Sequence, residues 1–512
     1  MISNSIPRRP HRGASRAKRT ALRRRDASAL LIFLCPSDRK KERKERKVRK
    51  VPTLQDAQQV FERGFRSSFE QEPRWIGLEN EYLLVTQDGK IAERETVSFL
   101  WHALIQQGWE AVYDEISKKV VGVKRKRSIS HPSSTYQYDL ITVDLGYAIL
   151  EIDLAPAPSL IVARSHLRQI LAAITSLLRQ KQVVLLGYGI QPLTPPEPTL
   201  FSEKGSSDLM YELYCSENAP RPDEHGVDMH TITAARQTHV ECSAEEAIPL
   251  LNALNVTSGL RVALLANSSL WRNQLGPYKA TRLTFNTWLW PGRRAQMGMP
   301  PVFRNSEHYI DYIFHFRSIS LKREHMLYRL DTRTLFSTFY GAEQGQLCTG
   351  EDGSQKVLLS EAEDVNTQCK FAWFTTRLQP GYGTIEDRVS CQQPPHEHWS
   401  ASALTIGLVE NEGPLIQLAS TLSYDRWYAI YELACEHGMQ FHYPGVDLDD
   451  YLKQILIIAT NGLQRRGFGE EAYLEPLVQR VAKHCCPADE VAKLITTGGI
   501  KAVVAYGNME SV

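Results

Sequence analysis

Four short apolar stretches of this chain each carry two polar side chains, of types common in active sites, at positions i and i+2. They are Glu79 and Glu81 in WIGLENEYLLV, Glu151 and Asp153 in AILEIDLAP, His239 and Glu241 in THVECS, and Glu386 and Arg388 in GTIEDRVSC. The apolar flanks predict β-strands, whose side chains alternate between the two faces of a sheet. Each pair therefore lies on one face of its strand, with about 7 Å between its two members.

If the four strands share a sheet, one face of it carries at least four carboxylates, a histidine and an arginine. So many negative charges held close together repel one another unless a cation lies among them. Oxygen-rich sites of this kind suit Mg²⁺, which takes one or two carboxylates and keeps positions for phosphate oxygens. The pattern predicts a sheet face that binds Mg²⁺ and a nucleotide.

Each pair taken alone also has a simpler interpretation. An acidic pair on a half-exposed strand is usually a solvated face, and His239 alone is equally compatible with a hydrogen-bonded core residue. The two acidic pairs are, however, flanked on both sides by Ile and Leu, so exposure is not expected. Burying an unpaired carboxylate costs several kcal/mol, so these residues either form salt bridges or bind metal.

The charge of the 512-residue chain is unevenly distributed. Residues 1–50 hold 18 Lys/Arg and 4 Asp/Glu, which leaves 42 basic and 54 acidic residues in the other 462. An acidic main part gives no support to nucleic-acid binding there. We interpret the basic segment as a disordered tail or as sequence upstream of the true start, with a transit peptide or a contact with nucleic acid or anionic lipid as alternatives.

Membrane insertion and disulfide bonding are not expected. The apolar run from Ala27 to Cys35 is too short for a bilayer, which needs about 20 residues, and no other stretch qualifies. Nine cysteines without C-x-x-C spacing indicate a reduced, cytoplasmic chain. The sequence gives no indication of the oligomeric state.

Predicted helices and strands do not alternate one for one, which favours an α+β fold over a doubly wound parallel sheet. We expect a large, mainly antiparallel sheet with packed helices and a helical C-terminal portion. By residue number, the parts are a basic tail (1–50), a catalytic α+β domain (51–420) and a helical portion packed on the same domain (421–512). Among the predicted elements are helices at 53–72 and 244–267, a strand at 370–377 and an exposed loop or hairpin tip around the KRKR run at 124–127.

Common nucleotide and metal motifs are absent. No G-x-x-x-x-G-K-[S/T] occurs, and GYGTIED at 381–387 is not G-x-G-x-x-G. An ATP site without them can be built from metal ions and arginines on an open sheet. An alternative is a zinc cluster from His225, His230 and His239 with Asp223, Glu224 and Asp228, although no H-E-x-x-H spacing supports it.

The acidic strands also resemble a known family. Gly77-Leu78-Glu79-Asn80-Glu81-Tyr82 resembles the G-x-E-x-E strand of the glutamate-cysteine ligase type 2 and carboxylate-amine ligase family. ILEIDLAPAPSL is similar to the family's second acidic strand. THVECSAEEAIPLLNALN is similar to its T-H-V-H strand, and LLANSSLWRNQLGPYKATR to its A-N-S-P-F-W segment. GTIEDRVSCQQPP is similar to its T-[L/I]-E-x-R-x-x-D strand. The likeness follows the family's order from Trp75 to Gly413.

The resemblance implies a glutamine-synthetase-like sheet that holds Mg²⁺ and ATP. In such enzymes a substrate carboxylate attacks the γ-phosphoryl group, and an amine then displaces the acyl phosphate. It implies metal ligands at Glu79, Glu81, Glu151, His239, Glu241 and Glu386, a catalytic role for Arg388 with Glu386, and substrate binding by Arg282 or by Arg293 and Arg294. Two departures stand out: Glu241 replaces a second histidine, and the last strand continues into Cys391-Gln392 where the family usually has Asp.

The first hypothesis is therefore an ATP- and Mg-dependent ligase of the glutamate-cysteine type. It would join the γ-carboxylate of glutamate to the amino group of cysteine, as in glutathione-type thiol biosynthesis, with small molecules as its substrates. One alternative is a ligase for another acid and amine pair. Another is a non-catalytic homologue that binds a nucleotide or a partner.

Overall fold

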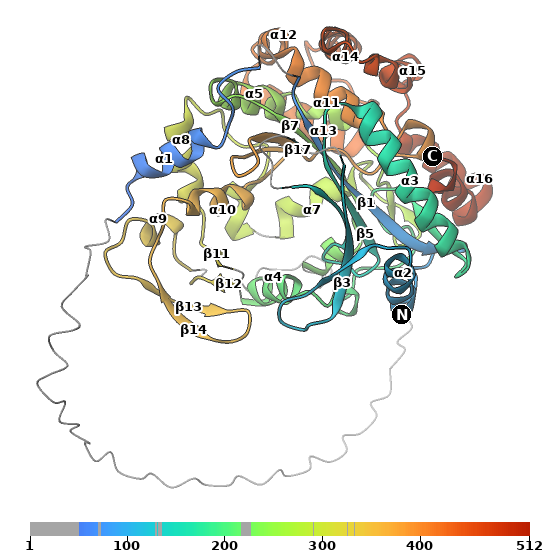
Figure 1. Ribbon diagram of the computed structural model, residues 1–512. Coiled ribbons are helices and arrows are strands. Elements are labelled where there is room, and N and C mark those ends of the chain that lie inside the picture. The colour runs from blue at the N-terminus through green and yellow to red at the C-terminus, as the bar shows by residue number, and fades with distance from the viewer. Residues whose placement is uncertain are drawn as a thin grey trace, which may run out of the picture. The chain divides into compact units, whose positions relative to one another are not determined.

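The four strands that carry the polar pairs are neighbours in one nine-stranded sheet (Figure 1). The computed structural model describes residues 51–512 apart from 70–72, 129–130, 132–135, 217–226, 290, 325 and 332. The basic segment 1–50 therefore lies outside the described residues. Across the sheet the order is β16 (Thr376–Gln379), β17 (Thr384–Asp387), β7 (Arg236–Glu241), β1 (Ile76–Thr86), β5 (Ile149–Ala157), β4 (Tyr138–Val143), β3 (Val120–Lys126) and β2 (Glu110–Tyr113), with β6 (Val183–Leu186) paired to the end of β1.

Strand register brings the polar pairs onto one face. On β1, Glu79 lies opposite Asp153 and Glu81 opposite Glu151. On β7, His239 lies opposite Glu386 of β17. Residues directly opposite one another in an antiparallel ladder point to the same side, and the strand pairings within this sheet are antiparallel. The predicted α+β class with a large antiparallel sheet is thus confirmed.

Helices cover the opposite face of the sheet because the alternate side chains there are apolar. Leu78, Tyr82 and Leu84 of β1 are fully buried or nearly so. Against this face lie α3 (Leu160–Arg179), α5 (Ala244–Val256) and α11 (Ser400–Glu410) (Figure 1). Helix α6 (Ser258–Leu265) reaches it through Arg261, which pairs with Asp387 of β17 at 2.6 Å. The helix α3 starts where Ser159 accepts a hydrogen bond from the Val162 N–H, an N-cap that satisfies one free helix donor.

The remaining helices form a C-terminal group and a second set that is spread along the rest of the chain. Towards the C-terminus the chain is helical, as predicted, through α12 (Glu412–Ala419), α13 (Tyr424–His437), α14 (Leu448–Arg466), α15 (Glu475–Lys483) and α16 (Pro487–Gly507). Helices α11 and α14 touch through glycines, since a Cβ on Gly462 would lie 2.0 Å from the Gly407 carbonyl oxygen. Elsewhere the chain forms α1 (Leu54–Arg63), α2 (Arg94–Gln106), α4 (Gly205–Ser216), α7 (Thr281–Leu289), α8 (Ser306–Phe314), α9 (Phe336–Phe339) and α10 (Asp364–Lys370).

A second, four-stranded antiparallel sheet is formed by residues that lie between β7 and β16 of the main sheet in the sequence. It consists of β11 (Ser320–Arg323), β12 (Met326–Arg329), β13 (Gln346–Gly350) and β14 (Gln355–Leu358). Four short strands form two further pairs: β8 (Leu270–Trp271) pairs with β9 (Gln274–Leu275), and β10 (Met297–Gly298) pairs in parallel with β15 (Trp373–Phe374). The last of these pairs contributes to the cavity described below.

Four predicted elements differ from the structure. The helix predicted at 53–72 is shorter, since α1 ends at Arg63. The KRKR run, predicted as an exposed loop or hairpin tip, is instead the end of a strand, because Lys124 to Lys126 belong to β3 near the sheet edge, where one face is open to solvent. The single helix predicted at 244–267 is two helices that bend by 54° beside Thr257. The strand predicted at 370–377 begins as the end of α10 and becomes β15 and β16 only after Ala372.

Among the described residues, no single helix is long and apolar enough to cross a bilayer; α5 and α6 together meet that criterion only as a bent pair. The seven cysteines that the structure describes as thiols are free and buried. Burial raises the pKa of Cys242, Cys369 and Cys435, so these thiols are protonated at neutral pH.

Candidate active site

A cavity of about 320 Å³ lies over the face of the sheet that carries the polar pairs. Its acidic side is formed by Glu79 and Glu81 from β1, Glu151 from β5, and Asp144 just after β4. Facing them are Arg282, Arg377 and Arg388, and apolar side chains close the rest: Leu145, Met210, Leu283, Met297, Trp373, Phe374 and Tyr431. The cavity thus places negatively and positively charged side chains beside an apolar wall.

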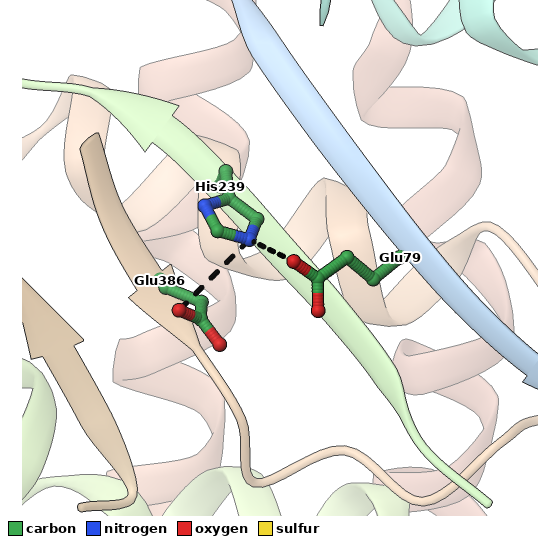
Figure 2. Close-up of side chains that lie close together, drawn as sticks. All are labelled: Glu79, His239 and Glu386. Carbon is green, nitrogen blue, oxygen red and sulfur yellow. Dashed lines mark hydrogen bonds and ion pairs between the residues drawn. The ribbon is translucent and has the colours of Figure 1, made fainter. Parts of the chain in front are cut away.

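Glu79, His239 and Glu386, here called the histidine group, converge from three neighbouring strands (Figure 2). His239 Nε2 lies 2.9 Å from Glu79 Oε1 and 3.9 Å from Glu386 Oε2. One ligand atom from each residue lies within 4.8 Å of the others, a spacing that can hold a metal ion. Gly77 stands opposite His239 and leaves it room, since a Cβ there would lie 3.3 Å from the His239 Cβ.

Cationic side chains already balance the charge of the histidine group. Glu386 is fully buried and accepts hydrogen bonds from Arg377 Nε at 2.6 Å, from Gln379 Nε2 at 2.7 Å and from Arg388. Burial opposes ionisation of Glu386, but Arg377, Arg388 and His239 outweigh it and hold its pKa far below the usual range. Burial likewise opposes protonation of His239, but Glu386 and Glu79 together raise its pKa.

A second cluster, Glu81, Asp144, Glu151 and Asp153, is here called the four-carboxylate group, and its charge is poorly balanced. Burial, with the charge of Asp144, raises the pKa of Glu81 to about 7. Burial and neighbouring carboxylates raise the pKa values of Glu151 and Asp153 well above normal. One buried oxygen, Asp153 Oδ1, has no hydrogen-bond partner in the described part of the chain.

These residues fit Mg²⁺. A cation near the four-carboxylate group would relieve the repulsion that raises its pKa values and would give Asp153 Oδ1 a partner. Carboxylate oxygens and open space for phosphate are what Mg²⁺ requires. The positive charge of Lys204 acts on Asp144, Glu151 and Asp153; its Nζ lies 3.3 Å from Thr142 Oγ1, which in turn donates to Glu151 Oε2.

Arg388 and Arg282 are positioned by the elements that precede them in the sequence. Arg388 follows β17 and donates to Gln237 and Glu386. Arg282 opens α7 just after the LLANSSLW segment, and its backbone N–H donates to Ser268 Oγ at 3.2 Å. Its guanidinium donates to the Arg388 carbonyl at 3.1 Å, which fixes the two arginines beside each other.

Three predicted site residues lie outside both the cavity and the histidine group. Glu241 shares the face of His239 but is one end of a salt-bridge cluster: it accepts from the Trp75 N–H at 2.8 Å and pairs with Arg66 and His131. Its charge is thus already compensated. Arg293 is buried and donates to the carbonyls of Arg317 and Ser318, while Arg294 is exposed.

The departures at the end of the last strand also lie outside the cavity. Gln392 is fully buried and donates to the Glu81 and Ala235 carbonyls, so it ties β1 and β7 together from behind. Cys391 is buried 3.5 Å from Ser268 Oγ. These replacements therefore do not reduce the number of acidic groups that line the cavity.

Sequence reasoning missed Arg377, Asp144 and Gln237. A signal for Arg377 exists, because a hairpin closed by GYG places it directly across from Glu386. His230, considered above only as a zinc ligand, lines the cavity, and burial together with Arg282 lowers its pKa to about 4. The other zinc candidates His225, Asp223 and Glu224 lie outside the described residues.

Comparisons with known proteins identify the family and the fold of the chain. The model of the glutamate-cysteine ligase family 2 matches residues 75–506. A glutamate-cysteine ligase from Francisella tularensis, solved in complex with AMP, has a similar fold: the TM-score is 0.52 at 12% identity, over 86% of this chain and 88% of that one. A bifunctional glutathione synthetase from Pasteurella multocida matches 89% of this chain and 53% of its own, at 11% identity and a TM-score of 0.46. No curated protein matches the chain in sequence.

Proposed function

The chain belongs to the glutamate-cysteine ligase family 2, a family of carboxylate-amine ligases, and we propose that it uses ATP to join the γ-carboxylate of glutamate to the amino group of cysteine. The observation that carries this proposal is the cavity itself, where four carboxylates face three arginines, with the histidine group and Asp153 beside them. That combination suits a reaction in which several anions must be brought together.

Two sets of residues would hold Mg²⁺, the histidine group and the four-carboxylate group. When bound there, the metal would neutralise the charge of the phosphates and of the substrate carboxylate. Glu81 and Glu151 belong to the second set and would share it with Asp144 and Asp153. We propose no metal role for Glu241, because it lies outside the cavity and the histidine group, where Arg66 and His131 engage its carboxylate.

Catalysis then depends on positioning and on fixed positive charge. The γ-carboxylate oxygen of glutamate forms a bond to the γ-phosphorus, and ADP leaves. The amine nitrogen of the acceptor next attacks the acyl carbon, phosphate leaves with that oxygen, and the nitrogen loses a proton. Arg388 and Arg377 stabilise the charge that develops on the transferred phosphoryl group, which asks little covalent chemistry of the protein.

Arg282 is the proposed partner of a substrate carboxylate. A guanidinium binds a carboxylate with two parallel hydrogen bonds, and the Arg388 carbonyl holds this one in place. The apolar wall formed by Trp373, Phe374 and Met297 keeps water from the acyl phosphate. We further propose that residues 51–420 form the catalytic part, that 421–512 support it, and that the reaction serves cytoplasmic thiol biosynthesis.

The test is substrate-dependent phosphate release by the full-length chain. Mg·ATP is supplied with glutamate and cysteine, and then with a panel of other acids and amines, and products are identified by mass spectrometry. We expect release only when an acid and an amine are both present, with γ-glutamylcysteine as the product. Release with a different pair would reassign the substrates, and no release with any pair would favour a non-catalytic binding protein.

Two arginine variants sharpen the assay. Arg282→Ala should raise the KM for the acid by about 10- to 100-fold, the usual effect of removing a charged hydrogen-bond partner. Arg294→Ala, an exposed arginine twelve positions later and outside the cavity, should leave it unchanged. Equal effects of the two substitutions would contradict the role of Arg282.

A further inference from the structure

Two exposed tyrosines stand beside the histidine group, and the reaction described above does not use them. Tyr382 occupies the turn between β16 and β17, and Tyr136 precedes β4. Tyr382 is 37% exposed and Tyr136 is 52% exposed. Their rings meet edge to face, with centroids 4.9 Å apart, and the Tyr136 hydroxyl donates to the Tyr382 hydroxyl at 3.2 Å.

This tyrosine pair is tied to the site by several contacts. The Tyr382 ring lies 6.1 Å from the His239 ring, centre to centre, at an angle of 61°. Lys370 Nζ lies 5.3 Å from the centre of the Tyr382 ring and donates to its hydroxyl at 3.4 Å. The Lys370 carbonyl in turn accepts from Arg377, the arginine that also binds Glu386. The pair is therefore held next to the groups that would bind phosphate.

Exposed rings in such a place have a chemical use. Tyrosine rings left open to solvent beside a phosphate site are suited to stack on a nucleobase, and such stacking tolerates any base because each presents a π-face. A purely structural role, packing at a hairpin tip, explains the contact between the rings but not why both stay exposed. The neighbouring lysine adds positive charge, as is common along nucleotide-binding surfaces.

We propose that Tyr382 and Tyr136 form the subsite for the purine base of ATP. This proposal rests on the proposed function, since it takes the histidine group and Arg377 to face the phosphates. The nucleotide then lies with its phosphates over the sheet and its base outward against the two rings, with Lys370 alongside. Both phenols are neutral at pH 7, since the ordinary pKa of a tyrosine hydroxyl is about 10; partial burial of the hydroxyls raises the pKa of Tyr136 to about 12 and also raises that of Tyr382.

Calorimetry on the full chain tests this subsite. The affinities for ADP and for inorganic triphosphate are measured separately, each with Mg²⁺. Tyr382→Leu and Tyr136→Leu should each weaken ADP by roughly 5- to 100-fold, the effect of losing one stacking ring. Triphosphate has no base, so its affinity should stay within about twofold in both variants. Tyr382→Phe and Tyr136→Phe keep the rings and should bind ADP like the parent.

The matched control is Tyr113→Leu, which removes a tyrosine that is 60% exposed on β2, at the opposite edge of the sheet. It should bind both ligands normally. Unchanged ADP affinity in the Leu variants, or an equal loss for ADP and triphosphate, would overturn the subsite. If those variants bind ADP normally while the parent still releases phosphate, the subsite is wrong and the ligase function stands. If the parent binds neither ligand, the proposed function itself is wrong.

Discussion

Neutralising Glu81 should stabilise the metal-free protein, although the residue lies in the catalytic cavity. Burial raises its pKa from about 4.5 to about 7, and each pKa unit corresponds to about 1.4 kcal/mol. Because the folded state holds this proton more tightly than the unfolded chain, stability falls as pH rises from 4.5 to 7. Glu81→Gln keeps the shape without the charge but loses one of the two hydrogen bonds that Glu81 accepts from Ala235 and Gln237, which costs about 1 kcal/mol. It should therefore add about 2 kcal/mol to the free energy of unfolding at pH 8. At pH 5 the gain should be below about 1 kcal/mol.

Glu386→Gln is the matched control, because the same chemical change should have the opposite sign. The pKa of Glu386 is lowered, and its charge pairs with Arg377 and Arg388. Removing one partner of a buried pair typically costs about 3–5 kcal/mol. Thermal denaturation in EDTA reports both effects: for a chain of this length 3 kcal/mol corresponds to roughly 3 °C. Destabilisation by both substitutions, or a Glu81→Gln gain that persists at pH 5, would refute the charge assignment of the cavity.

Three further outcomes follow from the placement of single residues. Glu79→Ala should lower turnover by more than about 100-fold without unfolding the chain, because it removes a metal-binding carboxylate; normal turnover would contradict that role, and circular dichroism checks the fold. Arg388→Ala should lower kcat by about 100- to 1,000-fold and change the KM for ATP less, as expected for a group that acts on the developing charge; the reverse split would make it a binding residue only. Cys391→Ser should leave steady-state turnover unchanged because Cys391 lies outside the cavity; a large loss would show that the end of the last strand takes part in the reaction.

The face of the sheet could be predicted from the sequence because strand periodicity is strict. Side chains two residues apart must point the same way, so Glu79 with Glu81 and Glu151 with Asp153 were bound to share a side. That the strands are neighbours follows from register, which the structure supplies: Glu79 meets Asp153 and His239 meets Glu386.

Periodicity does not tell which end of a strand lies under the cavity. Glu241 has the correct face but sits at the end of β7, where Trp75, Arg66 and His131 surround it. Partners of this kind come from segments distant in sequence, and no local pattern announces them. For the same reason Gln392 reads as a lost acidic position in the sequence, whereas in the structure it ties two strands together.

Local sequence patterns also failed to predict two elements whose form is set by tertiary packing. The composition of the charged run in β3 predicts an exposed loop or hairpin tip, yet Val123 beside it is fully buried and anchors the strand. Thr257 and Ser258 occupy the junction between α5 and α6, so neither a Gly nor a Pro marks the bend in the sequence at that point. Apolar spacing alone therefore predicted one helix where the fold needs two.

Transfer of oxygen from the acid to phosphate tests the central claim most directly. Glutamate labelled with ¹⁸O in its γ-carboxylate is incubated with cysteine, Mg·ATP and the full-length chain, and the released phosphate is analysed by mass spectrometry. An acyl phosphate requires that one carboxylate oxygen leaves with each phosphate, so we expect one ¹⁸O per phosphate for every amide formed. Amide formation with unlabelled phosphate, or ATP cleavage without any amide, would contradict the account.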